Sequence, residues 1–124
     1  MRYMMFIKHT EDYLGKTPPA GLMEAMGKFM GENMANGKFI DGNGLMSTHR
    51  GKKVQMRGGK LNVVDGPFTE SKEIIGGYAL MEIASDQEAL ELATHFMELH
   101  RIHWPEFEGE SELRPVQTGM PGSE

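Results

Sequence analysis

Two helix-forming segments, each placed between short apolar segments, constrain the fold of this chain more than any other feature. The first is expected to begin after Thr17, a possible N-cap before two prolines, and to end at Gly37. The second opens with Ser85-Asp86-Gln87-Glu88, the pattern of a capping box. It is expected to run to about His100, because Pro105 prevents continuation beyond that region. Each segment is apolar on one side only, so each must pack that side against a sheet.

Four segments around these helices have the composition of strands. Residues 3–7 are continuously apolar, which indicates a strand that is buried on both faces. Residues 39–46 are apolar at both ends and have Asp41-Gly42-Asn43-Gly44 between them, so a bulge or bend is expected there. Residues 78–83 form another mostly apolar strand. Residues 112–116 alternate and contain Pro115, which predicts an edge strand.

The clearest local signal is a hairpin between the second and third of these strands. Gly58-Gly59 lies between two alternating segments, as in a two-residue hairpin turn. This turn places Met56 opposite Leu61 and Val54 opposite Val63, on one face. The polar residues of the other face are Lys53, Gln55, Arg57, Lys60 and Asn62. Register and hydrophobic pattern therefore agree.

Without the hairpin the element order is βαββαβ, which predicts an α+β fold, the ferredoxin-like plait, with an inserted β-hairpin. We assign residues 1–117 to a single domain and residues 118–124 to a flexible C-terminal tail. Two helices cover only one face of such a sheet. Because the strands are apolar on both faces, we expect a homodimer in which two sheets pack face to face.

Composition narrows the class of protein further. The 124 residues include no cysteine, which excludes disulfides and thiol nucleophiles. The net charge of −5 argues against direct binding of nucleic acid. No apolar run approaches the roughly 18 residues of a membrane span, and the N-terminus lacks the pattern of a signal peptide. We therefore expect a cytoplasmic protein that does not associate with a membrane.

Three linked motifs follow the hairpin. They are Asp65-Gly66-Pro67-Phe68, Glu70-Ser71-Lys72-Glu73 and Gly76-Gly77-Tyr78. With these motifs the chain resembles the DGPF proteins of the YCII-related superfamily, over residues 2–116. The resemblance implies a dimeric α+β barrel. It also implies an enzymatic role, inferred from a His and an Asp in many members, and an association with extracytoplasmic-function sigma factors.

The chain departs from the family pattern at both of those residues. The family's His lies early in the first helix in a Pro-Ala-His-Leu-like context, where this chain has Pro19-Ala20-Gly21-Leu22. The family's Asp often lies in Asp-Pro-Phe or Asp-Pro-Tyr, where this chain has His103-Trp104-Pro105-Glu106-Phe107. A site in this chain must therefore use other residues.

We predict Asp65, His100 and His103 as catalytic acid–base residues. Asp65 lies in a Gly-Pro turn beside an aromatic residue; the alternative is that it only caps this turn. His100 is in line with the inner face of its helix and shares that face with His103. Their alternatives are a core histidine and a surface one, or a metal site with a nearby carboxylate. The predicted ligand-binding residues are His49, Phe68, Glu70, Lys72, Tyr78 and Trp104.

These residues suggest a small-molecule-binding protein, or a cofactor-independent enzyme, with a pocket between sheet and helices. The histidine spacing matches no standard metal motif, so neither a metal nor a cofactor is predicted. The alternative function is a non-catalytic regulatory or interaction module associated with an extracytoplasmic-function sigma factor. A third possibility, a cofactor-free oxygenase, rests on the shared fold alone.

Overall fold

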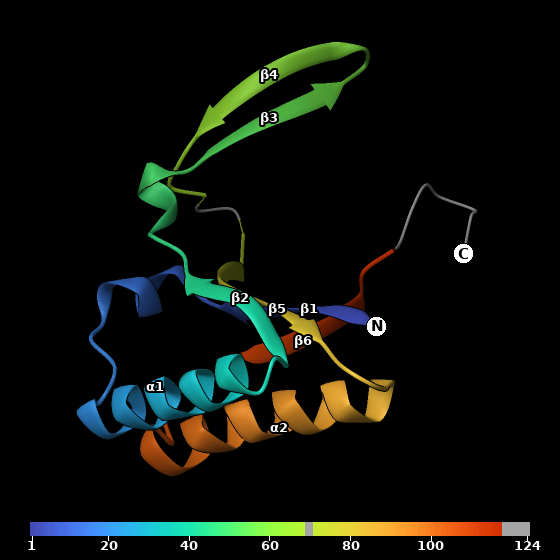
Figure 1. The fold of residues 1–124 in the computed structure, drawn as a ribbon. Helices are drawn as coiled ribbons and strands as arrows, with labels where there is room; N and C mark the ends of the chain where they lie inside the picture. The colour runs from blue at the N-terminus through green and yellow to red at the C-terminus, as the bar shows by residue number, and fades with distance from the viewer. Residues whose placement is uncertain (69–70, 118–124) are drawn as a thin grey trace.

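A four-stranded antiparallel sheet, covered on one face by two helices, forms the body of the protein (Figure 1). The computed structural model describes residues 1–68 and 71–117. Its elements are β1 (Arg2–His9), η1 (Glu11–Gly15), α1 (Ala20–Ala35), β2 (Phe39–Gly44), η2 (Thr48–Arg50), β3 (Lys52–Arg57), β4 (Lys60–Asp65), β5 (Ile74–Glu82), α2 (Asp86–His103) and β6 (Glu110–Pro115). The sheet order is β2-β5-β1-β6, with β3 and β4 in a separate hairpin. The predicted ferredoxin-like α+β fold is confirmed.

The two central strands explain why residues 3–7 and 78–83 are apolar on both faces. Met5 lies opposite Ala79 in the β1–β5 register, and both are buried beneath the helices. Side chains alternate across a strand, so the residues between them lie on the helix-free face. These residues are Met4, Phe6, Tyr78 and Leu80, and all four are partly exposed.

The helix boundaries follow the predicted capping residues at two of four ends, the end of α1 and the start of α2. The prediction of Thr17 as N-cap is wrong, because α1 begins at Ala20 with Pro19 in the N-cap position. Gly37 follows the helix with a φ of +82°, a left-handed conformation that glycine adopts without steric cost. Ser85 caps α2, since its hydroxyl accepts a hydrogen bond from the Glu88 amide at 3.1 Å. The helix continues three residues beyond the predicted end, to His103, and Pro105 follows.

The hairpin has the predicted turn and register. Gly58 and Gly59 have φ angles of +55° and +76°, as a type I′ turn requires. Val54 pairs with Val63 and Met56 with Leu61. The hairpin projects from the sheet on the side opposite the helices (Figure 1), and β3 and β4 contact chiefly each other. Its apolar face therefore remains outside the core.

Two further features of the strands agree with the sequence. The β2–β5 register shifts between Phe39 and Asp41, as expected for an interrupted strand. β6 is an edge strand that pairs only with β1 in this sheet. The predicted tail, residues 118–124, lies outside the described residues. In the part of the chain that is described, neither helix is long and apolar enough to cross a membrane.

Candidate functional site

A cavity of about 490 Å³ lies between the sheet and the helices. Most of its wall is apolar, and the wall comes from strands β1, β2 and β5, from helices α1 and α2, and from the connections beside them. The apolar side chains include Met5, Ile7, Leu22, Met26, Met30 and Phe96. Two histidines and three larger aromatic residues also line it. They are His9, Tyr13, His100, Trp104 and Phe107.

His9 is the last residue of β1 and is only 8% exposed. Its Nδ1 lies 2.8 Å from the Thr10 carbonyl oxygen. A carbonyl only accepts hydrogen bonds, so Nδ1 must carry a proton. The neutral form of the ring then has its lone pair on Nε2. Gly76 makes this position possible, because a Cβ atom there would lie 1.9 Å from Nε2.

His100 lies on the last turns of α2 and is 7% exposed. Its Nδ1 is 3.0 Å from the Phe96 carbonyl oxygen one turn earlier, so the proton is again on Nδ1. Burial lowers the pKa of His100, and the neighbouring His9 lowers it further, against the opposing effect of the Phe96 carbonyl. The neutral imidazole is therefore favoured at pH 7. Within residues 1–68 and 71–117, Nε2 of neither histidine has a hydrogen-bonding partner.

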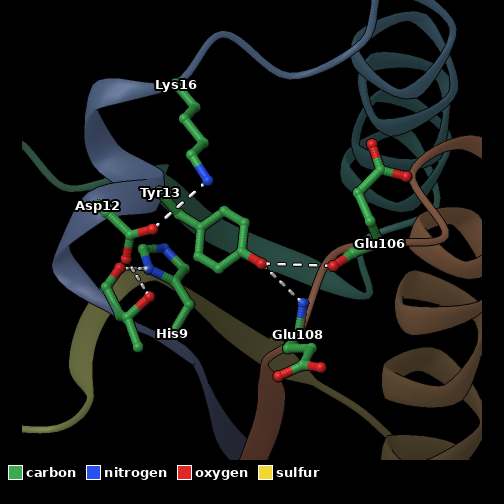
Figure 2. A network of polar contacts seen from close by, with 7 residues as sticks. His9, Asp12, Tyr13, Lys16, Glu106 and Glu108 are labelled. Atoms are coloured by element: carbon green, nitrogen blue, oxygen red, sulfur yellow. Dashed lines mark hydrogen bonds and ion pairs between the residues drawn. The ribbon is translucent and has the colours of Figure 1, made fainter.

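Aromatic rings surround both imidazoles. The Phe107 ring centroid lies 6.0 Å from that of His9 and 4.8 Å from that of His100. Tyr13 contacts the edge of His9 at 5.7 Å between centroids. Its hydroxyl donates to the Glu106 carbonyl at 3.4 Å and accepts from the Glu108 amide at 3.2 Å (Figure 2). These bonds join η1 to the α2–β6 connection and hold the tyrosine ring beside His9.

The Asp-Gly-Pro-Phe turn lies at the base of the hairpin. Asp65 accepts a hydrogen bond from the Lys52 ammonium at 2.5 Å. The Gly66 amide donates to the Gly51 carbonyl at 2.9 Å. Only glycine fits at position 66, because a Cβ atom there would lie 1.5 Å from the Thr48 carbonyl oxygen. The turn therefore joins the end of β4 closely to η2 and the start of β3.

Glu11 connects this turn to the cavity. Its carboxylate accepts hydrogen bonds from the Ser47 hydroxyl at 2.7 Å, the Thr48 amide at 2.9 Å and the Thr48 hydroxyl at 2.6 Å. These bonds, those from Thr48 first, lower the pKa of Glu11. The Thr48 hydroxyl also accepts from the Phe68 amide at 3.1 Å. Glu11 is the first residue of η1, which contains Tyr13.

Residues 1–96 match the model of the YCII-related domain. The chain belongs to the YCII-related domain family. No curated protein matches it. The matched region of the YCII-related domain includes His9, Tyr13 and the Asp-Gly-Pro-Phe turn, whereas His100, Trp104 and Phe107 follow it.

Not all of the predicted site residues lie at the cavity of this YCII-related domain. His100 and Trp104 line it, and Tyr78 borders it from β5, although its side chain lies on the helix-free face of the sheet. The Tyr78 hydroxyl donates to Asp41 Oδ2 at 2.9 Å. Phe68 lines a second hollow of about 610 Å³, together with Arg50 and other residues near η2.

The other predicted residues are separate from these two spaces. In the described part of the chain, Asp65, Lys72, His49 and His103 line neither. His49 Nδ1 lies 2.9 Å from the Ser47 hydroxyl. His103 lies beside Gly21, where a Cβ atom would come within 3.2 Å of its Nδ1. Glu70 lies outside the described residues. The structure thus does not bring Asp65 together with His100.

Sequence reasoning missed His9, Tyr13 and Phe107. A signal for His9 existed, because Tyr3, Met5, Ile7 and His9 alternate along β1 and so share the helix-facing side. Tyr13 and Phe107 had no comparable signal, since Tyr13 lies in the short helix η1 and Phe107 in the α2–β6 connection, where no periodic pattern indicates which side chains face inward. Among the residues described, no three His, Asp or Glu side chains are grouped as ligands of one metal ion.

Proposed function

We propose that this protein binds a small, largely apolar organic molecule in the cavity, and that His9 and His100 contact its polar group. One observation carries the proposal. Two buried imidazoles line the same apolar cavity, each with Nδ1 bonded to a backbone carbonyl and Nε2 without a partner among the described residues. In the described residues, Ser111 Oγ is a fully buried polar atom without a partner, whereas the two Nε2 atoms are not fully buried, so each can be reached by a ligand or a bound water.

The chemistry of the two Nε2 atoms defines the ligand class. A neutral imidazole accepts a hydrogen bond through Nε2, so the ligand should carry a weakly acidic O–H group, as a phenol does. An ionised group would be desolvated by the apolar wall, which favours a ligand that enters in its neutral form. If the bound molecule reacts, His100 is available as a general base, because its lowered pKa keeps Nε2 unprotonated at pH 7.

We also propose that the protein is a homodimer, with the helix-free sheet faces of two copies packed together. Met4, Phe6, Tyr78 and Leu80 give this face an apolar centre. A sheet face of this kind requires a cover, and in the described residues of one copy the helices lie on the other face.

Titration with 4-nitrophenol tests the binding site, because its absorbance reports both binding and ionisation. His100→Gln and His9→Gln should each weaken binding about tenfold, the loss of roughly one hydrogen bond. His95→Gln is the matched control, since His95 lies on the same helix but is exposed and contacts Phe29 instead. His103→Gln tests the role predicted from the sequence.

Equal affinity in the parent, His9→Gln and His100→Gln proteins would refute the proposed contacts. Native mass spectrometry, followed by denaturation of the same sample, extends the test to a ligand retained from the cell. If phenols do not bind and no mass is lost on denaturation, the alternative of a regulatory module for an extracytoplasmic-function sigma factor becomes the better hypothesis. Capture of a sigma factor by the purified protein then tests it.

A further inference from the structure

The hairpin β3–β4 carries an apolar surface that its own chain does not cover. Two cross-strand pairs form this surface, which we call the hairpin apolar face. Its members are Val54, Met56, Leu61 and Val63, with exposures of 68, 70, 74 and 62%. On the polar face, Lys53 at the base of the hairpin contacts the turn that follows β4, because its ammonium lies 4.3 Å from the centroid of the Phe68 ring. Four adjacent exposed apolar side chains are characteristic of an interaction surface.

The hairpin lies where a second copy is expected. Figure 1 shows it on the side of the sheet opposite α1 and α2. This is the side of the helix-free face, where we propose the second copy. A body packed on that face would therefore lie beside the hairpin.

Charge favours a second copy as the occupant. The hairpin, Lys52–Asp65, contains four cationic residues and one carboxylate, which gives it a formal charge of +3. The whole chain carries −5, so its remaining residues carry −8. Two hairpins packed against each other would repel, whereas a hairpin on the body of another copy would be attracted.

We propose that the hairpin is a dimerisation arm, whose apolar face packs against the acidic body of a second copy of this chain. The inference rests on the homodimer proposed above and assigns the hairpin a role in it. In a two-fold symmetric dimer each copy provides one arm and receives one. The hairpin apolar face, exposed in a single copy, becomes buried in the pair.

Two double variants of the full chain test the arm. Met56→Lys with Leu61→Lys places two charges on the hairpin apolar face. Gln55→Lys with Asn62→Lys is the matched control, because this neighbouring cross-strand pair adds the same charges to the opposite face. Sedimentation over a dilution series should show the dissociation constant of the dimer rising about 100-fold in the first variant, as for a charge placed in an interface centre. The control should change it less than about threefold. Circular dichroism checks that both variants are folded.

The outcomes separate the arm from the other proposals. If the parent is a dimer and the two variants dissociate equally, the arm is refuted while the sheet-face dimer stands. If the hairpin binds a different protein, the arm alone is refuted, and if the parent is a monomer, both the arm and the dimer are refuted. Phenol binding is measured independently in either case.

A second measurement applies even if the charged variant does not fold. The chain has no cysteine, so Leu61→Cys and Asn62→Cys each introduce a single site for a nitroxide spin label. The label at position 61 should be immobilised in the dimer and the label at position 62 should remain mobile. Equal mobility at the two positions would contradict the arm.

Discussion

Replacement of Gly76 with alanine should displace the His9 imidazole from the cavity. A Cβ atom at position 76 would lie 1.9 Å from His9 Nε2 and 2.5 Å from His9 Cε1, well inside van der Waals contact. Gly76 does not have a positive φ, so its backbone conformation accepts alanine. The conflict with His9 is therefore the main cost of the substitution.

The loss of unfolding free energy can be worked out from the contacts that His9 would lose. Its hydrogen bond to the Thr10 carbonyl contributes about 1 kcal/mol. Its edge contacts with the rings of Tyr13 and Phe107 contribute roughly 0.5–1.5 kcal/mol each. We therefore expect Gly76→Ala to lower the free energy of unfolding by about 2–4 kcal/mol, as measured by urea denaturation with circular dichroism.

Two comparisons make this result specific. Gly31→Ala in α1 is the matched control, because its Cβ would meet no atom of the described residues within 4 Å. It should raise the free energy of unfolding by about 0.5–1 kcal/mol. In a His9→Ala background, Gly76→Ala should be neutral or stabilise by up to about 1 kcal/mol. An equal loss with and without the His9 ring would refute the reasoning, because the ring could not then be its source.

Three further predictions concern pH and the turn. Because the pKa of His100 is lowered in the folded state, the unfolded chain takes up the proton first, so stability should fall as the pH drops below about 6.5. His100→Gln should flatten this part of the pH profile of urea midpoints. The pKa of Glu11 is likewise lowered from its ordinary value of 4.5 in the folded state. Glu11→Gln should therefore destabilise the protein at pH 7, and the difference in stability between parent and variant should shrink as the pH falls below 4.5. Gly66→Ala should lower the free energy of unfolding by more than about 4 kcal/mol, because the new Cβ atom would clash with the backbone oxygen of Thr48. The measurement is the loss of soluble folded protein.

Local patterns were sufficient wherever the determining contacts lie within one element. The Gly58-Gly59 turn fixes the hairpin register, and Ser85 fixes the start of α2, because both act on neighbours in the sequence. The inward position of His100 followed from helical periodicity in the same way.

The rest of the site depends on contacts that no local pattern encodes. The prediction grouped Asp65 with His100 because both were polar candidates near one end of the sheet. Instead, Asp65 pairs with Lys52 across the hairpin, and the direction of the hairpin is set by packing around η2. Likewise, the alternation in the hairpin predicts an apolar face but gives no information on whether that face joins the core, and in the structure it stays exposed. The His9 position required knowledge that Gly76, from the neighbouring strand, leaves space for its ring.

The Asp-Gly-Pro-Phe turn does not line the cavity, but a chain of hydrogen bonds connects it to one wall of the cavity. The Phe68 amide donates to the Thr48 hydroxyl, and that hydroxyl donates to Glu11. Glu11 is the first residue of η1. The same short helix contains Tyr13, whose hydroxyl is hydrogen-bonded to the α2–β6 connection. A hydroxyl that both donates and accepts fixes the distance between its two partners. The turn therefore positions the hairpin on one side and one wall of the cavity on the other. A change in the turn would therefore shift Tyr13 through η1, although the turn does not itself line the cavity.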